Sequence, residues 1–131
     1  MKASLTTKKL LACIAISLAV CAAGEDAAAR HKATMDAAQD QKDELQDAFD
    51  AKSAAKVSEA AEKLVAFGQA EELYWTKAGI PEGVALAQQN LAASKQIVKD
   101  ATVGQLNQAA AAFSKLNDSC RACHDLHLEK R

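Results

Sequence analysis

From about Ala27 to His127 the chain consists almost entirely of residues that favour helices, and this constrains its fold more than any other feature. Alanine, glutamine, lysine, glutamate and leucine dominate the stretch, and all five have high helix propensity. No segment alternates apolar and polar residues as a half-buried strand does. The sequence therefore predicts an all-α domain.

Breaks in the pattern divide this stretch into four predicted helices, which cover about Ala27 to Ala51, Ser53 to Lys77, Pro81 to Ala101 and Thr102 to His127. Ser53 and Asp50 are the candidate N-caps of the second helix, and Thr102 is the predicted N-cap of the fourth. Pro81, the only proline, suits the first turn of the third helix. Because the connections are short, we expect an antiparallel up-down-up-down four-helix bundle.

Each predicted helix carries an apolar stripe that marks the expected core. The stripe of the fourth helix is the clearest: Leu106, Ala110, Phe113, Leu116, Cys120 and Cys123 with His124. The others are Val57, Ala60, Leu64, Phe67 and Tyr74; Val84, Ala87, Leu91 and Val98; and Met35, Ala38, Leu45 and Phe49, which Lys42 interrupts. Alanine supplies most of the apolar residues, so the core is thin for residues 25–131. A bulky apolar cofactor would supply what the side chains lack.

Residues 1–24 have the pattern of a secretory signal peptide. Lysines at positions 2, 8 and 9 precede an apolar run over residues 10–20, and small residues follow over 21–24. The run is shorter than the ~20 apolar residues of a spanning helix. We expect cleavage after one of residues 22–24, leaving a single mature domain, 25–131, in the periplasm. Membrane association is expected only in the alternative case, in which Cys21 becomes a lipidated N-terminus.

Cys120-Arg121-Ala122-Cys123-His124 matches Cys-x-x-Cys-His, the attachment signature of c-type haem. Two thiols at this spacing can bond the two vinyl groups of one porphyrin, and His124 is placed to ligate the iron. The alternatives are a redox Cys-x-x-Cys pair and a zinc site that adds His127, although one straight helix arranges four tetrahedral ligands poorly. The sequence therefore predicts one covalently attached haem c.

The expected topology also supplies a candidate for the sixth iron ligand. The start of the first helix lies beside the end of the fourth in such a bundle, so Met35 can face His124 across it. Met35 is the only methionine that remains once residues 1–24 are removed. His31, one turn earlier, is the alternative ligand, and an open position is the third case. Tyr74 and Trp75 are expected at the same end, as haem-packing residues or as ordinary core.

An exported four-helix domain with this motif on its last helix resembles the class II cytochromes c, the family of cytochrome c′ and low-spin cytochrome c-556. The resemblance covers residues 25–131 in architecture. In the low-spin members a methionine of the first helix is the sixth ligand, which Met35 matches, whereas the high-spin members leave the iron five-coordinate and bind small gases. The chain departs from the family where His127 and Leu128 replace an aromatic residue and an arginine, and where Trp75 lies on the second helix rather than the third.

We therefore expect an electron-transfer protein rather than an enzyme, because the sequence contains no nucleophile–base pair and no carboxylate cluster around an open site. The alternative function is a five-coordinate haem protein that binds NO or CO. Removing the three lysines of the signal peptide from the 16 basic residues leaves 13 against 17 acidic ones, a net charge of −4. This charge disfavours nucleic acid and favours periplasmic redox partners with a basic docking face. Members of the family often pair through their first two helices, so the sequence leaves open whether the chain forms a homodimer.

Overall fold

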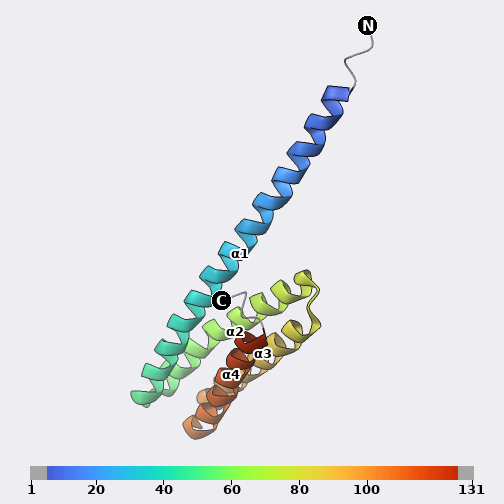
Figure 1. Ribbon diagram of the computed structural model, residues 1–131. Coiled ribbons are helices and arrows are strands. Elements are labelled where there is room, and N and C mark those ends of the chain that lie inside the picture. The colour runs from blue at the N-terminus through green and yellow to red at the C-terminus, as the bar shows by residue number, and fades with distance from the viewer. Residues whose placement is uncertain (1–5, 127–131) are drawn as a thin grey trace. The chain divides into compact units, whose positions relative to one another are not determined.

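The computed structural model describes the backbone of residues 6–126 and the side chains of residues 26–126. This part of the chain forms four α-helices and no strand: α1 (Thr6–Asp50), α2 (Ala54–Ala78), α3 (Pro81–Thr102) and α4 (Leu106–Leu126). The chain divides into two compact units, Met1–Ala33 and Thr34–Arg131. The second unit holds the C-terminal part of α1 together with α2, α3 and α4, and its successive helices run antiparallel (Figure 1). The predicted all-α class is confirmed.

α1 begins much earlier than predicted, at Thr6 rather than near Ala27. Leucine, alanine and isoleucine make up eight of residues 10–20, and leucine and alanine favour a helix strongly. The predicted signal peptide therefore has no helix boundary to separate it from the domain, and its removal stays a prediction. Within the part of the chain that the structure describes, no helix combines the length and the apolar character needed to cross a membrane.

The second and third helices begin where the sequence predicts. Ser53 has extended backbone angles, and its hydroxyl accepts a hydrogen bond from the backbone N–H of Lys56 at 3.4 Å. Ser53 is thus the N-cap of α2, whereas Asp50 is the last residue of α1. Pro81 occupies the first turn of α3, as predicted. Gly79 ends α2 in the left-handed conformation, with φ 70°.

The predicted cap of the fourth helix is wrong. Thr102 is the last residue of α3, and its hydroxyl donates a hydrogen bond to the carbonyl of Val98 at 2.7 Å. The turn that follows contains Gly104 with φ 75°, which a residue with a side chain adopts with difficulty. α4 consequently begins at Leu106.

The core of the second unit lies at one end of the bundle, where α1 ends, α2 begins, α3 ends and α4 begins. Seven of the thirteen buried residues of this core are alanines: Ala48, Ala60, Ala61, Ala93, Ala101, Ala109 and Ala112. The predicted stripe of α4 is wrong at Ala110, which is exposed, while Ala109 is fully buried. Phe49 and Phe113 add bulk by stacking at 5.7 Å between ring centroids. Small side chains thus fill one half of the bundle and leave the other half to the cavity described below.

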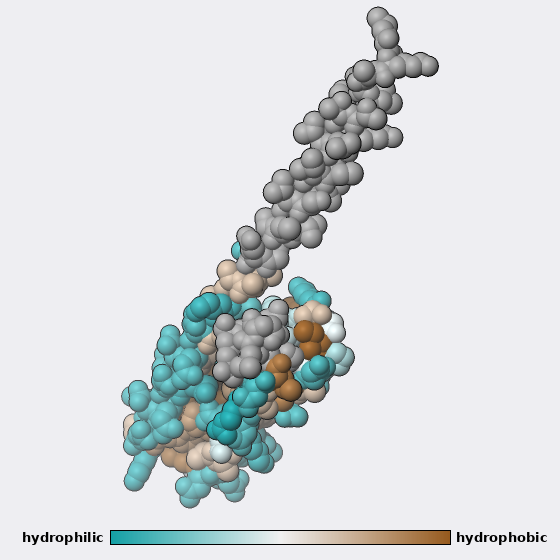
Figure 2. Space-filling model, viewed as in Figure 1, coloured by the Kyte–Doolittle hydropathy of each residue, from teal (hydrophilic) through white to brown (hydrophobic). Residues whose placement is uncertain are grey.

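Hydrophilic side chains cover most of the described surface on the face drawn in Figure 2. Three large apolar side chains are exposed in the described part of the chain: Leu73, Val103 and Leu126. They lie on α2, on the α3–α4 connection and at the end of α4. Single exposed apolar residues of this kind are ordinary on a protein surface.

Candidate cofactor site

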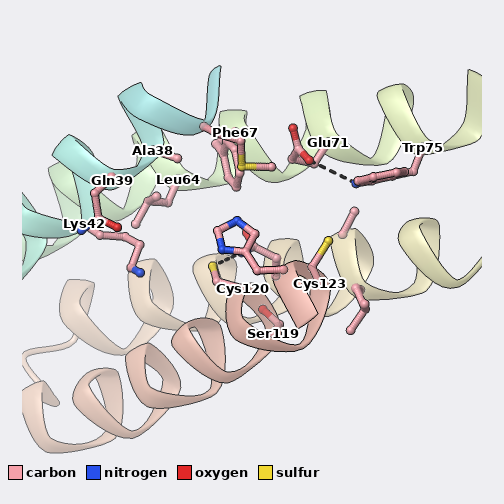
Figure 3. Close-up of a pocket in the computed structure, with 15 residues that line it drawn as sticks. Ala38, Gln39, Lys42, Leu64, Phe67, Glu71, Trp75, Ser119, Cys120 and Cys123 are labelled. Atoms are coloured by element: carbon pink, nitrogen blue, oxygen red, sulfur yellow. Dashed lines mark hydrogen bonds between the residues drawn. The ribbon is translucent and has the colours of Figure 1, made fainter. Parts of the chain in front are cut away.

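All four helices of the second unit contribute to one cavity, with an empty volume of about 580 Å³ that includes space open to solvent. The residues that line it are Met35, Ala38, Gln39, Lys42, Leu64, Phe67, Glu71, Trp75, Leu86, Ala87, Asn90, Ser119, Cys120, Cys123 and His124 (Figure 3). Most of the walls are apolar, and a few polar groups face the space between them.

α4 brings the three chemically reactive residues of the Cys-x-x-Cys-His motif to this cavity. Cys120, Cys123 and His124 are three and four residues apart, so a helix presents them on one face, and all three line the cavity. Both cysteines are half-buried, and neither forms a disulfide. His124 is partly in the cavity wall and partly exposed to solvent.

Met35 lines the same cavity from α1. The sequence argument placed Met35 opposite the end of the fourth helix, and the structure brings Met35 and His124 to one cavity. Iron ligation by either residue stays a prediction. His31 belongs to the first compact unit, whereas every residue of the cavity belongs to the second. His127 lies outside the described residues.

Trp75 forms part of the cavity wall and is only 1% exposed. Tyr74 does not line the cavity; its ring is half-buried and meets Trp75 edge-on, with 5.0 Å between centroids and an interplanar angle of 83°. Gly83 makes room for the indole, because a Cβ at this position would lie 2.6 Å from Cδ2 of Trp75. Of the two predicted aromatic residues, Trp75 is therefore the one in contact with the cavity.

Glu71 is a cavity residue that the sequence analysis missed. Its side chain is 4% exposed, and its Oε2 accepts a hydrogen bond from the indole Nε1–H of Trp75 at 3.1 Å. The position itself carried a signal: Leu64, Gly68, Glu71 and Trp75 follow one another at spacings of three or four, and all are buried. A charged residue on the apolar face of a helix either reaches solvent or is buried with a polar role. Glu71 is buried.

Asn90 is the second missed residue, and it is 5% exposed. Its Nδ2 donates a hydrogen bond to Sγ of Cys120 at 3.3 Å. Its Oδ1 is buried without a hydrogen-bond partner among the described residues. A buried acceptor left unsatisfied costs about 1–3 kcal/mol, so this amide fits a cavity that is completed by an occupant or by an ordered water.

The environment of the two thiols keeps them protonated. Burial raises the pKa of Cys123 to about 11, and the Glu71 carboxylate and the neighbouring Cys120 act in the same direction. Burial also raises the pKa of Cys120, although the Lys42 ammonium and the hydrogen bond from Asn90 oppose it. Redox Cys-x-x-Cys pairs have the opposite property, because a lowered pKa supplies their thiolate. The site is therefore poorly suited to thiol–disulfide exchange.

The donor set fits a haem better than a bare metal ion. Among residues 26–126, no group of three or more histidine, cysteine, aspartate or glutamate side chains could hold a metal ion. A haem iron takes four nitrogens from its porphyrin and needs only axial ligands from the protein. One histidine and one methionine in a mostly apolar cavity, with two thiols beside them, meet that requirement.

We compared the chain with models of protein families, with curated proteins and with solved structures, and nothing matches it. The resemblance to the class II cytochromes c is carried by residues of this chain alone, namely the motif that ends at His124, Met35 on α1 and the order of four helices. Membership of that family stays a prediction.

Proposed function

We propose that this chain is a monohaem c-type cytochrome of class II that carries single electrons in the periplasm. The observation that carries the proposal is the meeting of Cys120, Cys123 and His124 on α4 with Met35 on α1 in one cavity. Each of these residues has the chemistry that a covalently attached, six-coordinate haem requires, and they come from opposite ends of the sequence.

Each residue has a definite role in this proposal. Cys120 and Cys123 would hold the haem through two thioether bonds, and His124 and Met35 would ligate its iron. When bound, the haem supplies a reversible one-electron change at the iron, with a potential that a methionine ligand raises. Leu64, Phe67 and Trp75 line the cavity and would pack against the macrocycle.

The position of Met35 in the cavity favours electron transfer over gas binding. A soft thioether in the cavity can fill the sixth position, and an iron with both axial positions filled has no site for NO or CO. Such an iron also changes its geometry little between its two charge states, as an electron carrier requires. The gas-binding alternative holds if Met35 only packs beside the haem.

The absorption spectrum of the reduced, haem-loaded protein, with and without carbon monoxide, tests the proposal. We expect a low-spin spectrum that carbon monoxide leaves unchanged. Replacement of Met35 (M35A) should open the sixth position and allow prompt binding of carbon monoxide. Leu86→Ala is the matched control, because Leu86 lines the cavity from α3 without a donor atom, and it should behave as the unmodified protein.

Each other outcome has a definite meaning. Prompt binding of carbon monoxide by the unmodified protein would replace electron transfer with gas binding. A colourless protein, expressed together with the haem-attachment machinery, would overturn the haem assignment itself. Export is tested separately, because cleavage after one of residues 22–24 would appear in the mass of the mature protein.

A further inference from the structure

Two opposite charges face the same cavity, and the sequence pattern explains neither. Lys42 comes from α1 and Glu71 from α2, both across the cavity from α4 and its two cysteines (Figure 3). Among the described residues, no other acidic or basic side chain lines the cavity apart from His124 of the motif. The walls around Lys42 and Glu71 are otherwise apolar or uncharged.

Water screens both charges less than it screens charges on the open surface, because Glu71 is buried and Lys42 is half-buried. Glu71 is 4% exposed and is fixed by its hydrogen bond with the indole of Trp75. Lys42 is half-buried, and in the described part of the chain it forms no ion pair with an acidic side chain. Charges in such positions act over longer distances than exposed ones and lose less of their effect in salt.

Lys42 and Glu71 line the same cavity as Cys120, Cys123 and His124, the residues that would hold the haem. Both charged side chains lie on the wall opposite the two cysteines (Figure 3). A haem bonded to the sulfurs of these cysteines and to His124 would therefore lie near both charged side chains. The two charges would act on the iron in opposite directions.

We propose that Glu71 and Lys42 set the reduction potential of the haem in this cavity, Glu71 lowering it and Lys42 raising it. The inference rests on the proposed function. Oxidation removes one electron from the iron, adds one positive charge to the site and changes no bond. A fixed negative charge nearby stabilises that added charge, and a fixed positive charge opposes it.

Spectroelectrochemical titration of the haem-loaded protein tests this with two charge-removing variants. Glu71→Gln should raise the midpoint potential, and its amide oxygen can still accept the hydrogen bond from Trp75. Lys42→Gln should lower the midpoint potential. The double variant should lie between the two single variants, because their effects oppose each other.

Two exposed residues provide matched controls, Glu62→Gln on α2 and Lys95→Gln on α3, neither of which lines the cavity. Their shifts should be smaller than those of the cavity variants and should vanish in high salt, whereas the cavity shifts should persist. Circular dichroism checks that every variant keeps its helices, which separates loss of charge from loss of fold.

Shifts no larger than those of the controls, or shifts of the opposite sign, would overturn the inference while leaving the haem assignment intact. If Glu71→Gln fails to take up haem, Lys42→Gln decides alone. Lys42 is only half-buried and forms no ion pair within residues 26–126, so its replacement should leave the fold intact. An unmodified chain without haem overturns the proposed function, and this inference with it.

Discussion

Burial makes the Cys123 thiol a weaker acid than a free cysteine. Burial raises its pKa to about 11, with the Glu71 carboxylate and Cys120 acting in the same direction. We expect iodoacetamide to alkylate Cys123 slowly in the haem-free chain at pH 8, where only about one thiol in a thousand is ionised. The rate should rise about tenfold per pH unit up to about pH 11. Mass spectrometry of the labelled peptide measures it, with the urea-unfolded chain as the control.

The same shift gives a pH dependence of folding with a definite sign. The thiol ionises near pH 9 in the unfolded chain and near pH 11 in the folded one. The unfolded state therefore binds fewer protons between these values, and the free energy of unfolding falls as the pH rises from 9 to 11. Cys123→Ala should flatten this part of the pH profile. An unchanged pH profile in this variant would show that the thiol does not lie in a desolvated site. Equal alkylation rates in the folded and unfolded chains would show the same.

At the scale of single residues, the sequence predicted the reactive side chains and missed the polar groups around them. Cys120, Cys123 and His124 stood out because a local motif specifies them. Glu71 and Asn90 did not, because their burial depends on which residues of other helices cover them. Local spacing places Glu71 on the buried face of α2, but it does not say which residues of the other helices lie against that face.

The contact between α2 and α3 depends on a glycine near the start of α3. A Cβ at Gly83 would lie 2.6 Å from Trp75, so we expect Gly83→Ala to lower the free energy of unfolding by about 1–3 kcal/mol. This loss should outweigh the gain of up to about 1 kcal/mol in helix propensity. Urea unfolding followed by circular dichroism measures it.

Ala85→Gly is the control for propensity, because Ala85 is exposed on the same helix. It makes the reverse change of residue type at a position away from Trp75. It should lower the free energy of unfolding by roughly 0.5–1 kcal/mol. A Gly83→Ala protein as stable as the unmodified one would mean that the indole moves aside freely, and Trp75 would then not be a fixed wall of the cavity.

Helices were easier to predict than their ends. The stretch from Ala54 to Ala78 followed from composition and from a serine that could cap it, and Pro81 marked the next start. The start of α4 was misplaced because Thr102 can either cap a following helix or bond back to its own, and it does the latter. The start of α1 was misplaced because an apolar leader and an amphipathic helix share the same helix formers.

At the scale of the whole molecule, the alanine-rich core implies that the proposed haem would supply a large part of the domain's stability. We expect a Cys120→Ala/Cys123→Ala chain, which cannot attach haem, to melt at least about 10 °C below the loaded protein, equivalent to roughly 2 kcal/mol for a domain of this size. The physical reason is that the large cavity loses its apolar filling. Thermal melting followed by circular dichroism measures the difference.

Arg121→Ala is the control within the motif, because Arg121 is exposed and its ion pair with Asp118 is a surface pair of little energetic value. It should melt close to the unmodified protein. Equal melting temperatures for the loaded protein and the double cysteine variant would show that the helices pack fully without the cofactor.

The order of the cavity walls along the chain has a consequence for biosynthesis. Ribosomes and export channels release a polypeptide from its N-terminus, and the walls from α1, α2 and α3 all precede α4, which bears the thiols. If the chain attaches a haem as proposed, the walls that would receive the porphyrin emerge before the two cysteines that would bond to it. Attachment at Cys120 and Cys123 would then be the last step in closing the cavity, and the helices that had already packed would not have to separate.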